Sequence, residues 1–214
     1  MIRTFRMQVA GSTVAIDADD SLAEQANWML RTLAPVFQNE IKDGDRFRMG
    51  WSSLTAHLVS GEIRLYEPDF RTDPFRDENP DVSLTLQVTA AQTDFLHRTG
   101  MQAYEDLPFF AHKLILQRGV LERDRIAMLR RERVSGDDSG WFVAPAAETG
   151  EIQPVSPTGG YEAVYSYQLL RLRPAMLIVL GLPAGCVVVF NGSQITSAVD
   201  PQNRTIWPPA AAID

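Results

Sequence analysis

Residues 54–66 read LTAHLVSGEIRLY, in which the runs Leu54 to Val59 and Glu62 to Tyr66 flank Ser60-Gly61. Two short runs of strand-forming residues on either side of a Ser-Gly pair are typical of an antiparallel hairpin. Immediately upstream, Arg46 to Trp51 has the composition of a further strand. The stretch therefore predicts an antiparallel meander, and with it a fold class of α+β built on antiparallel sheets with a few packing helices.

The residues before this meander predict a hairpin and one helix. Phe5 to Val9 and Thr13 to Ile16 alternate around Gly11-Ser12, as paired strands do. Ser21 with Glu24 three residues later resembles a capping box at the start of a helix. The apolar residues that follow keep helical spacing: Leu22, Ala26, Met29, Leu30, Leu33 and Phe37. We expect this helix to pack its apolar face on the sheet.

Residues 67–81, EPDFRTDPFRDENPD, contain six acids, two arginines and three prolines. Such a composition does not suit a regular element and predicts a long, solvent-facing surface loop. Carboxylates can steer a basic protein surface towards the loop, and two phenylalanines can anchor it. The residues that we expect to bind a partner are Glu67, Asp69, Phe70, Asp73, Phe75, Asp77 and Glu78.

The second half of the chain predicts further short elements. Strands are expected at 82–88 and 141–143, a short helix at 90–98, and a helix at 161–172; 125–131 fits either a strand or the end of a helix. A second long loop is expected at 144–160. The uncharged stretch 175–190 contains two glycines and a proline, so it indicates a buried helix, a turn and a buried strand. Asn191-Gly192 predicts a closing two-residue hairpin.

A composition break at 134–139 suggests an N-terminal region, 1–133, and a C-terminal region, 134–214, packed either separately or as one continuous unit. The chain has 214 residues, of which 45% are hydrophobic and 22% charged, as in ordinary globular proteins. Twenty basic against 27 acidic residues give a net charge of −7, which disfavours binding to nucleic acid. The N-terminus has no apolar signal sequence and the chain no membrane-spanning stretch, so we expect a cytoplasmic protein.

Residues able to carry out catalysis do not cluster in the sequence. The three histidines, His57, His97 and His112, lack metal-ligand spacing. The single cysteine, Cys186, lies in an apolar stretch where a thiol is usually inert. We therefore expect no catalytic residue, no metal and no cofactor. Two other hypotheses remain open: a metal-dependent hydrolase that uses the carboxylates of residues 67–81, and a sensor domain for a small ligand.

Four segments together resemble a known group of proteins: GWSSL at 50–54, LYEPDF at 65–70, DSGWF at 138–142 and LPAG at 182–185. They are similar to bacterial immunity-type proteins of polymorphic toxin and secretion-effector systems. The resemblance implies a non-enzymatic, cytosolic α+β protein that binds and neutralises a cognate toxin.

The DSGW segment itself has a structural explanation. Asp138 and Ser139 suit a turn, and Gly140 suits a backbone conformation that other residues avoid. Trp141, followed by Phe142 and Val143, is expected to enter the core as part of a strand.

Overall fold

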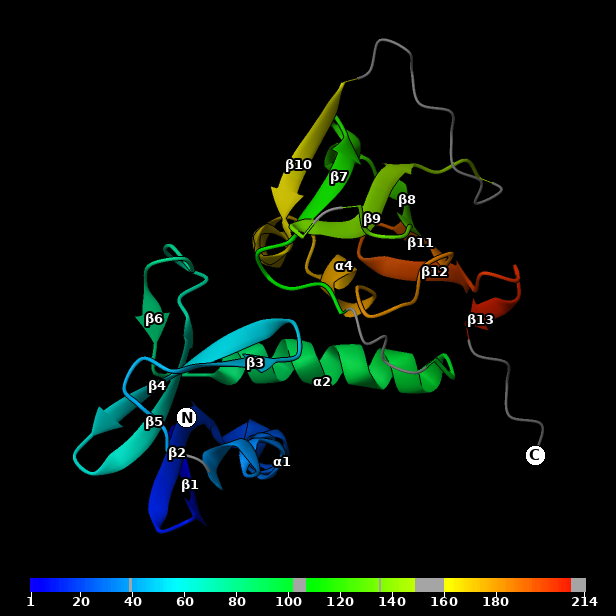
Figure 1. Ribbon diagram of the computed structural model, residues 1–214. Coiled ribbons are helices and arrows are strands. Elements are labelled where there is room, and N and C mark those ends of the chain that lie inside the picture. Colours follow the sequence, from blue (N-terminus) through cyan, green and yellow to red (C-terminus); the bar gives the residue numbers. More distant parts are fainter. Residues whose placement is uncertain (39, 102–106, 135, 149–159, 209–214) are drawn as a thin grey trace, which may run out of the picture. The chain divides into compact units, whose positions relative to one another are not determined.

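The computed structural model describes residues 1–38, 40–101, 107–134, 136–148 and 160–208. The chain forms two compact units, Met1–Ala90 and Ala91–Asp214, each built around one sheet (Figure 1). The fold class is α+β, as predicted. The boundary between the units falls inside helix α2 (Ser83–Arg98).

The sheet of the first unit has the order β1-β2-β5-β4-β3, with β6 paired to β5. Its strands are β1 (Ile2–Val9), β2 (Ser12–Asp19), β3 (Arg46–Met49), β4 (Ser52–Val59), β5 (Glu62–Pro68) and β6 (Glu78–Asn79). The meander β3-β4-β5 and the hairpin β1-β2 confirm the sequence-based prediction. Ala10 and Gly11 form the turn of that hairpin, both at positive φ.

One helical segment supplies much of the remaining core of this unit. It comprises the 3-10 turn η1 (Asp20–Leu22), helix α1 (Ala23–Leu33) and the 3-10 turn η2 (Val36–Gln38). Its buried side chains lie in one hydrophobic cluster with those of the sheet: Ala26, Met29, Leu30, Leu33 and Phe37. The segment begins at η1, where Asp19 accepts a hydrogen bond from the Ser21 amide as the N-cap.

The strand predicted at 82–88 is wrong, because these residues belong to the continuous helix α2. The alternation of leucine and valine in SLTLQVT gave the strand period. The buried face of the helix also includes polar residues, among them Thr85, Thr89 and Gln92. The apolar residues of 82–88 alone therefore did not indicate the 3.6-residue period of a helix.

The sheet of the second unit has the order β10-β7-β9-β8-β11-β12-β13. Its strands are β7 (Lys113–Gln117), β8 (Arg125–Arg130), β9 (Asp138–Pro145), β10 (Tyr161–Tyr165), β11 (Val187–Asn191), β12 (Gln194–Val199) and β13 (Thr205–Trp207). Strands β7 and β9 run parallel, and the other pairs are antiparallel. The composition break at 134–139 lies between β8 and β9, which pair with each other in this sheet.

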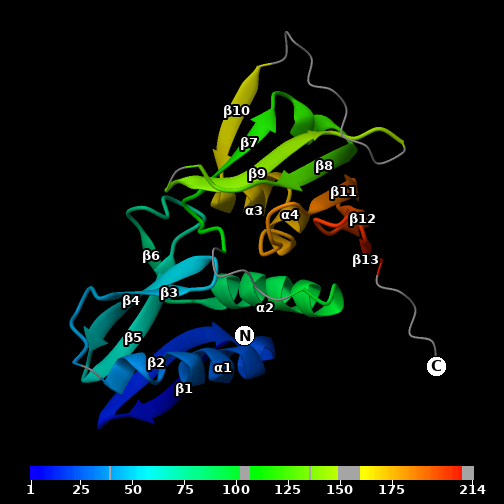
Figure 2. The same ribbon diagram turned by 45° about the vertical axis from the view of Figure 1, so that its right-hand side comes forward.

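Short helical turns complete the second unit: η3 (Val120–Glu122), η4 (Ser166–Gln168), α3 (Leu169–Leu172) and α4 (Ala175–Ile178). Figure 2 shows α3 and α4 on one side of the sheet. The stretch 175–190 is a helix, a turn and a strand, as predicted. No helix in the part of the chain that the structure describes is long and apolar enough to cross a membrane.

Two details of this unit differ from the prediction. Residues 161–165 form strand β10 and not the start of a helix, because they pair along β7 at the edge of the sheet. The hairpin β11-β12 exists, but Asn191 pairs with Gln194, so Gly192-Ser193 forms its turn. The loop expected at 144–160 starts after β9, and its residues 149–159 lie outside the described residues.

Trp141 is fully buried in this unit, as predicted. Truncating it removes a large apolar side chain and leaves a cavity, which costs about 3–5 kcal/mol for a buried tryptophan. We expect Trp141→Ala to lower the free energy of unfolding by that amount in a denaturant titration. Trp28→Ala, at a tryptophan that is 43% exposed, is the matched control and should have a much smaller effect. Equal effects of the two substitutions would contradict a core role for Trp141.

Candidate functional site

The acidic segment 67–81 is folded back on the first sheet and is not an extended loop. Glu67 and Pro68 belong to β5 and pair with Asn79 and Glu78 of β6. The Asp69 amide also donates to the Asp77 carbonyl oxygen at 2.8 Å. Because the two ends of the segment are held together, the residues between them form a compact tip.

Two of the residues expected to bind a partner are buried. Glu67 is only 2% exposed, and Phe70 is 6% exposed with its ring stacked on Trp51 at 4.9 Å between centroids. The expectation that the whole segment faces solvent is therefore wrong at these two positions. A phenylalanine among charges gives no sign in the sequence that a tryptophan 19 residues earlier will cover it.

The remaining acids of the segment differ in how far they are engaged. Asp69 and Asp73 accept hydrogen bonds from backbone amides two residues later, at Arg71 and Phe75, each at 3.0 Å. Glu78 contacts His57 Nε2 at 2.6 Å, which ties β6 to β4. Among the residues expected to bind a partner, Phe75, 47% exposed, and Asp77 are exposed, and the tip also exposes the two cations Arg71 and Arg76.

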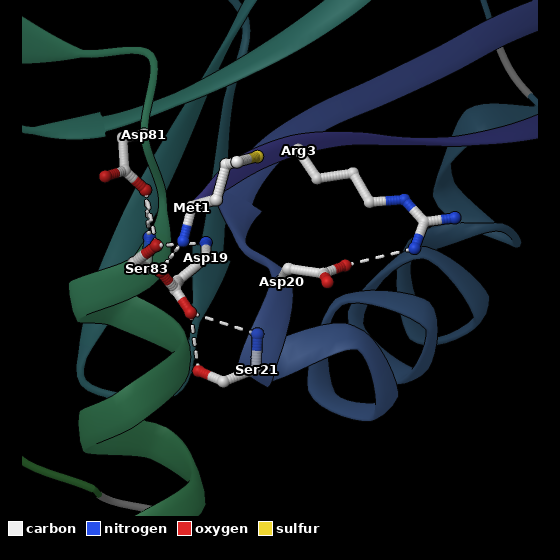
Figure 3. A network of polar contacts seen from close by, with 7 residues as sticks. All are labelled: Met1, Arg3, Asp19, Asp20, Ser21, Asp81 and Ser83. Atoms are coloured by element: carbon white, nitrogen blue, oxygen red, sulfur yellow. Dashed lines mark hydrogen bonds and ion pairs between the residues drawn. The ribbon is translucent and has the colours of Figure 1, made fainter.

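A polar network fixes the start of helix α2 to the N-terminus of the chain (Figure 3). Asp81 accepts a hydrogen bond from the Ser83 amide at 3.0 Å, and the Ser83 hydroxyl accepts one from the Asp19 amide at 2.7 Å. The Asp19 carboxylate pairs with the Met1 ammonium at 2.9 Å. Hydrogen bonds from Ser21 and this ammonium lower the pKa of Asp19.

A cleft of about 310 Å³ lies beside this network in the first unit. Four acids line it: Asp19, Glu67, Asp69 and Asp81. Each of them accepts a hydrogen bond from the chain itself, so their carboxyl groups hold turns and the helix start in place. Among the residues that the structure describes, no three His, Cys, Asp or Glu side chains are placed to hold a metal ion. The hydrolase hypothesis therefore gains no support from this cleft.

Glu67 is the most perturbed group of the cleft. Its carboxyl group accepts a hydrogen bond from the Thr85 amide at 2.7 Å inside the protein. Burial raises its pKa to about 8, because desolvation penalises the charged form more than the Thr85 hydrogen bonds favour it. Glu67 is consequently neutral in the folded protein at pH 7.

In the second unit, the DSGW segment forms the start of β9. The Gly140 amide donates to Asp138 Oδ1 at 2.7 Å, and the Trp141 amide donates to Ser139 Oγ at 3.1 Å. Gly140 has a φ of +77°, and a Cβ at this position would collide with the Arg131 carbonyl oxygen. The turn thus requires glycine, and it directs the Trp141 side chain into the core.

Arg130 is a buried residue of this region that sequence reasoning missed. It is 2% exposed, and its guanidinium lies 5.9 Å from the centroid of the Trp141 ring, as in a cation–π contact. The neighbouring Trp141 Nε1 donates to the Leu180 carbonyl oxygen at 3.2 Å. In the string RIAMLRR, nothing distinguishes the buried arginine from the exposed Arg131.

A family model described as the Imm33-like domain matches residues 91–201, just over half of the chain. The chain belongs to the Imm33-like family. No curated protein and no solved structure matches it. Imm33-like proteins are of the immunity type, a class that is generally non-enzymatic and acts on toxins. The match spans strands β7 to β12, whereas the acidic segment lies outside it.

The raised pKa of Glu67 predicts that the free energy of unfolding of this Imm33-like protein falls as the pH rises. The folded protein holds the Glu67 proton up to about pH 8, whereas the unfolded chain releases it near the ordinary glutamate pKa of 4.5. Between these values, each pH unit costs at most about 1.4 kcal/mol of stability from this group. We expect Glu67→Gln to lose this dependence. The melting temperature of the variant minus that of wild type should therefore increase from pH 5 to pH 8. A constant difference between the two proteins would contradict the burial of a neutral Glu67.

Proposed function

We propose that this Imm33-like protein is a non-enzymatic immunity protein that binds and neutralises a cognate toxin or secreted effector in the cytoplasm. The family match over residues 91–201 carries the proposal. It covers six of the seven strands of the second sheet, so it concerns a folded unit and not a short motif. Neutralisation by binding requires a surface and no catalytic group.

Charge supports a contribution of the first unit to the encounter. Residues 1–90 carry 14 acidic and nine basic side chains. The tip, residues 69–77, holds three of these acids and two of the arginines, Arg71 and Arg76, and exposes Phe75 and Asp77. We propose that the tip steers a basic toxin surface towards the protein. Attraction of this kind acts mainly on the association rate and is screened by salt within about 8 Å at physiological ionic strength.

The function can be tested by screening the proteins encoded beside the gene of this chain for toxicity. Each toxic protein is expressed from an inducible promoter, with and without the Imm33-like protein. We expect wild type to restore growth and the purified pair to form a stable complex. The matched control is Trp141→Ala, which should lose protection in proportion to its loss of folded protein. Growth arrest in the presence of abundant, folded wild type would contradict the proposed function.

The tip can be tested by Asp77→Asn. Asp73 accepts a hydrogen bond that holds a turn and Glu78 contacts His57, so changing either residue would also lower stability. Asp77→Asn is expected to slow association with the toxin about two- to threefold at low salt and to leave dissociation unchanged. Glu40→Gln, which removes one exposed acid elsewhere in the unit, is the control. Equal association rates for the two variants would show that the tip takes no part in the encounter.

A further inference from the structure

The two faces of the second sheet have different neighbours. On one face, the Trp141 indole donates a hydrogen bond to the carbonyl oxygen of Leu180, which follows α4, and Figure 2 shows α3 and α4 on this side. The side chains of this face are fully buried, as Trp141, Val143 and Met128 show. Side chains that alternate with them along the strands point to the opposite, outer face.

An unbroken row of apolar residues crosses the outer face. Strand register places its members side by side on six adjacent strands, one residue from each. All are partly or largely exposed. In the order of the strands, this outer row consists of Ala163, Ile115, Phe142, Leu129, Val187 and Val199.

The composition of the outer row is unusual for a face in water. A sheet with one solvated face normally alternates between apolar residues towards the core and polar residues outwards. Here the row is apolar throughout, and on one side of it the neighbouring residues of the same face are small and buried: Ala144, Ala127 and Val189. The accessible apolar part of this face is the row itself, in which Ala163 is exposed and the other five residues are partly exposed. A contiguous exposed row of apolar residues marks an interaction site more often than an ordinary surface.

Cationic groups flank one side of the row. The exposed Arg131 places its guanidinium 5.0 Å from the centroid of the Phe142 ring. Lys113 Nζ lies 5.4 Å from the Tyr165 ring and 2.9 Å from the Asp137 carboxylate. An apolar surface with a carboxylate at its margin complements this arrangement, because the carboxylate can pair with Arg131 while apolar groups cover Phe142.

We propose that the outer row is the surface on which the toxin docks, through an apolar patch bordered by an acidic residue. This inference rests on the proposed function and assigns it to a face of the unit that the family model matches. The apolar contact would set the lifetime of the complex, whereas the acidic tip of the first unit would act on the rate of encounter.

The test measures the affinity of the purified toxin identified in the growth screen for variants of the full chain. We expect Leu129→Gln to weaken binding at least tenfold, mainly through faster dissociation. Leu172→Gln changes a residue of α3 that is 48% exposed and lies off the row, and should bind like wild type. A second variant, Ile115→Thr with Val187→Thr, keeps the β-branched shape of both side chains. It tests the same surface if Leu129→Gln does not fold.

Four outcomes decide the matter. Weaker binding by both row variants, with melting temperatures close to wild type, supports the docking surface. Unchanged affinity of the folded row variants, with wild type bound, overturns this inference alone. Failure of wild type to bind the toxin overturns the proposed function and this inference together. A wild-type dimer in analytical ultracentrifugation that Leu129→Gln converts to a monomer also overturns it, because a second copy would then cover the row.

Discussion

The hydrogen bond from Trp141 Nε1 to the Leu180 carbonyl oxygen joins an interior strand of the larger sheet to the helical segment on one of its faces. The strand can make this contact because Gly140 takes a left-handed conformation just before the tryptophan. Arg130, on the neighbouring strand, places its guanidinium near the same indole ring. The large core side chains Trp141, Val143 and Met128 therefore lie on one face of the sheet, and the further proposal concerns the partly exposed residues on the other.

The first unit uses charge in a different way. Its acidic residues look in the sequence like a single interaction loop, yet several of them serve the fold. Asp81 and Glu67 accept hydrogen bonds from the first amides of α2, where acceptors are favourable because these amides have no partner within the helix. Asp69 and Asp73 hold turns. The net negative charge of the unit persists, and its exposed acids lie both on the tip, at Asp77, and elsewhere, as at Glu40.

Sequence periodicity predicted the elements whose apolar residues match their burial. Strands β4 and β5 and the N-terminal hairpin follow directly from alternation and from turn residues. The second half of helix α2 agrees with the helix predicted at 90–98, whereas its first half was missed, because the buried face there contains Thr85, whose role depends on contacts distant in sequence. Strand β10 was missed because its pairing with β7, and not its composition, decides its conformation.

The expected exposure of two candidate site residues was wrong for a related reason. Phe70 and Glu67 have the residue types of an exposed anchor and an exposed acid, and their burial depends on Trp51 and Thr85, which no local pattern connects to them. The outer row is likewise absent from any motif. Each of its members looks like an ordinary core residue, and only the register of six strands reveals that they share a face without a described helix.

The central claim is that the toxin covers the outer row, and chemical protection of a single thiol tests it most directly. In Leu129→Cys, the new thiol lies on the row, whereas Cys186 is buried and its pKa is raised to about 11, so it adds little background. The account predicts that alkylation at position 129 slows at least tenfold when toxin is bound, and that Leu172→Cys reacts at the same rate with and without it. Equal alkylation of Cys at 129 in the free and the bound protein would contradict the account.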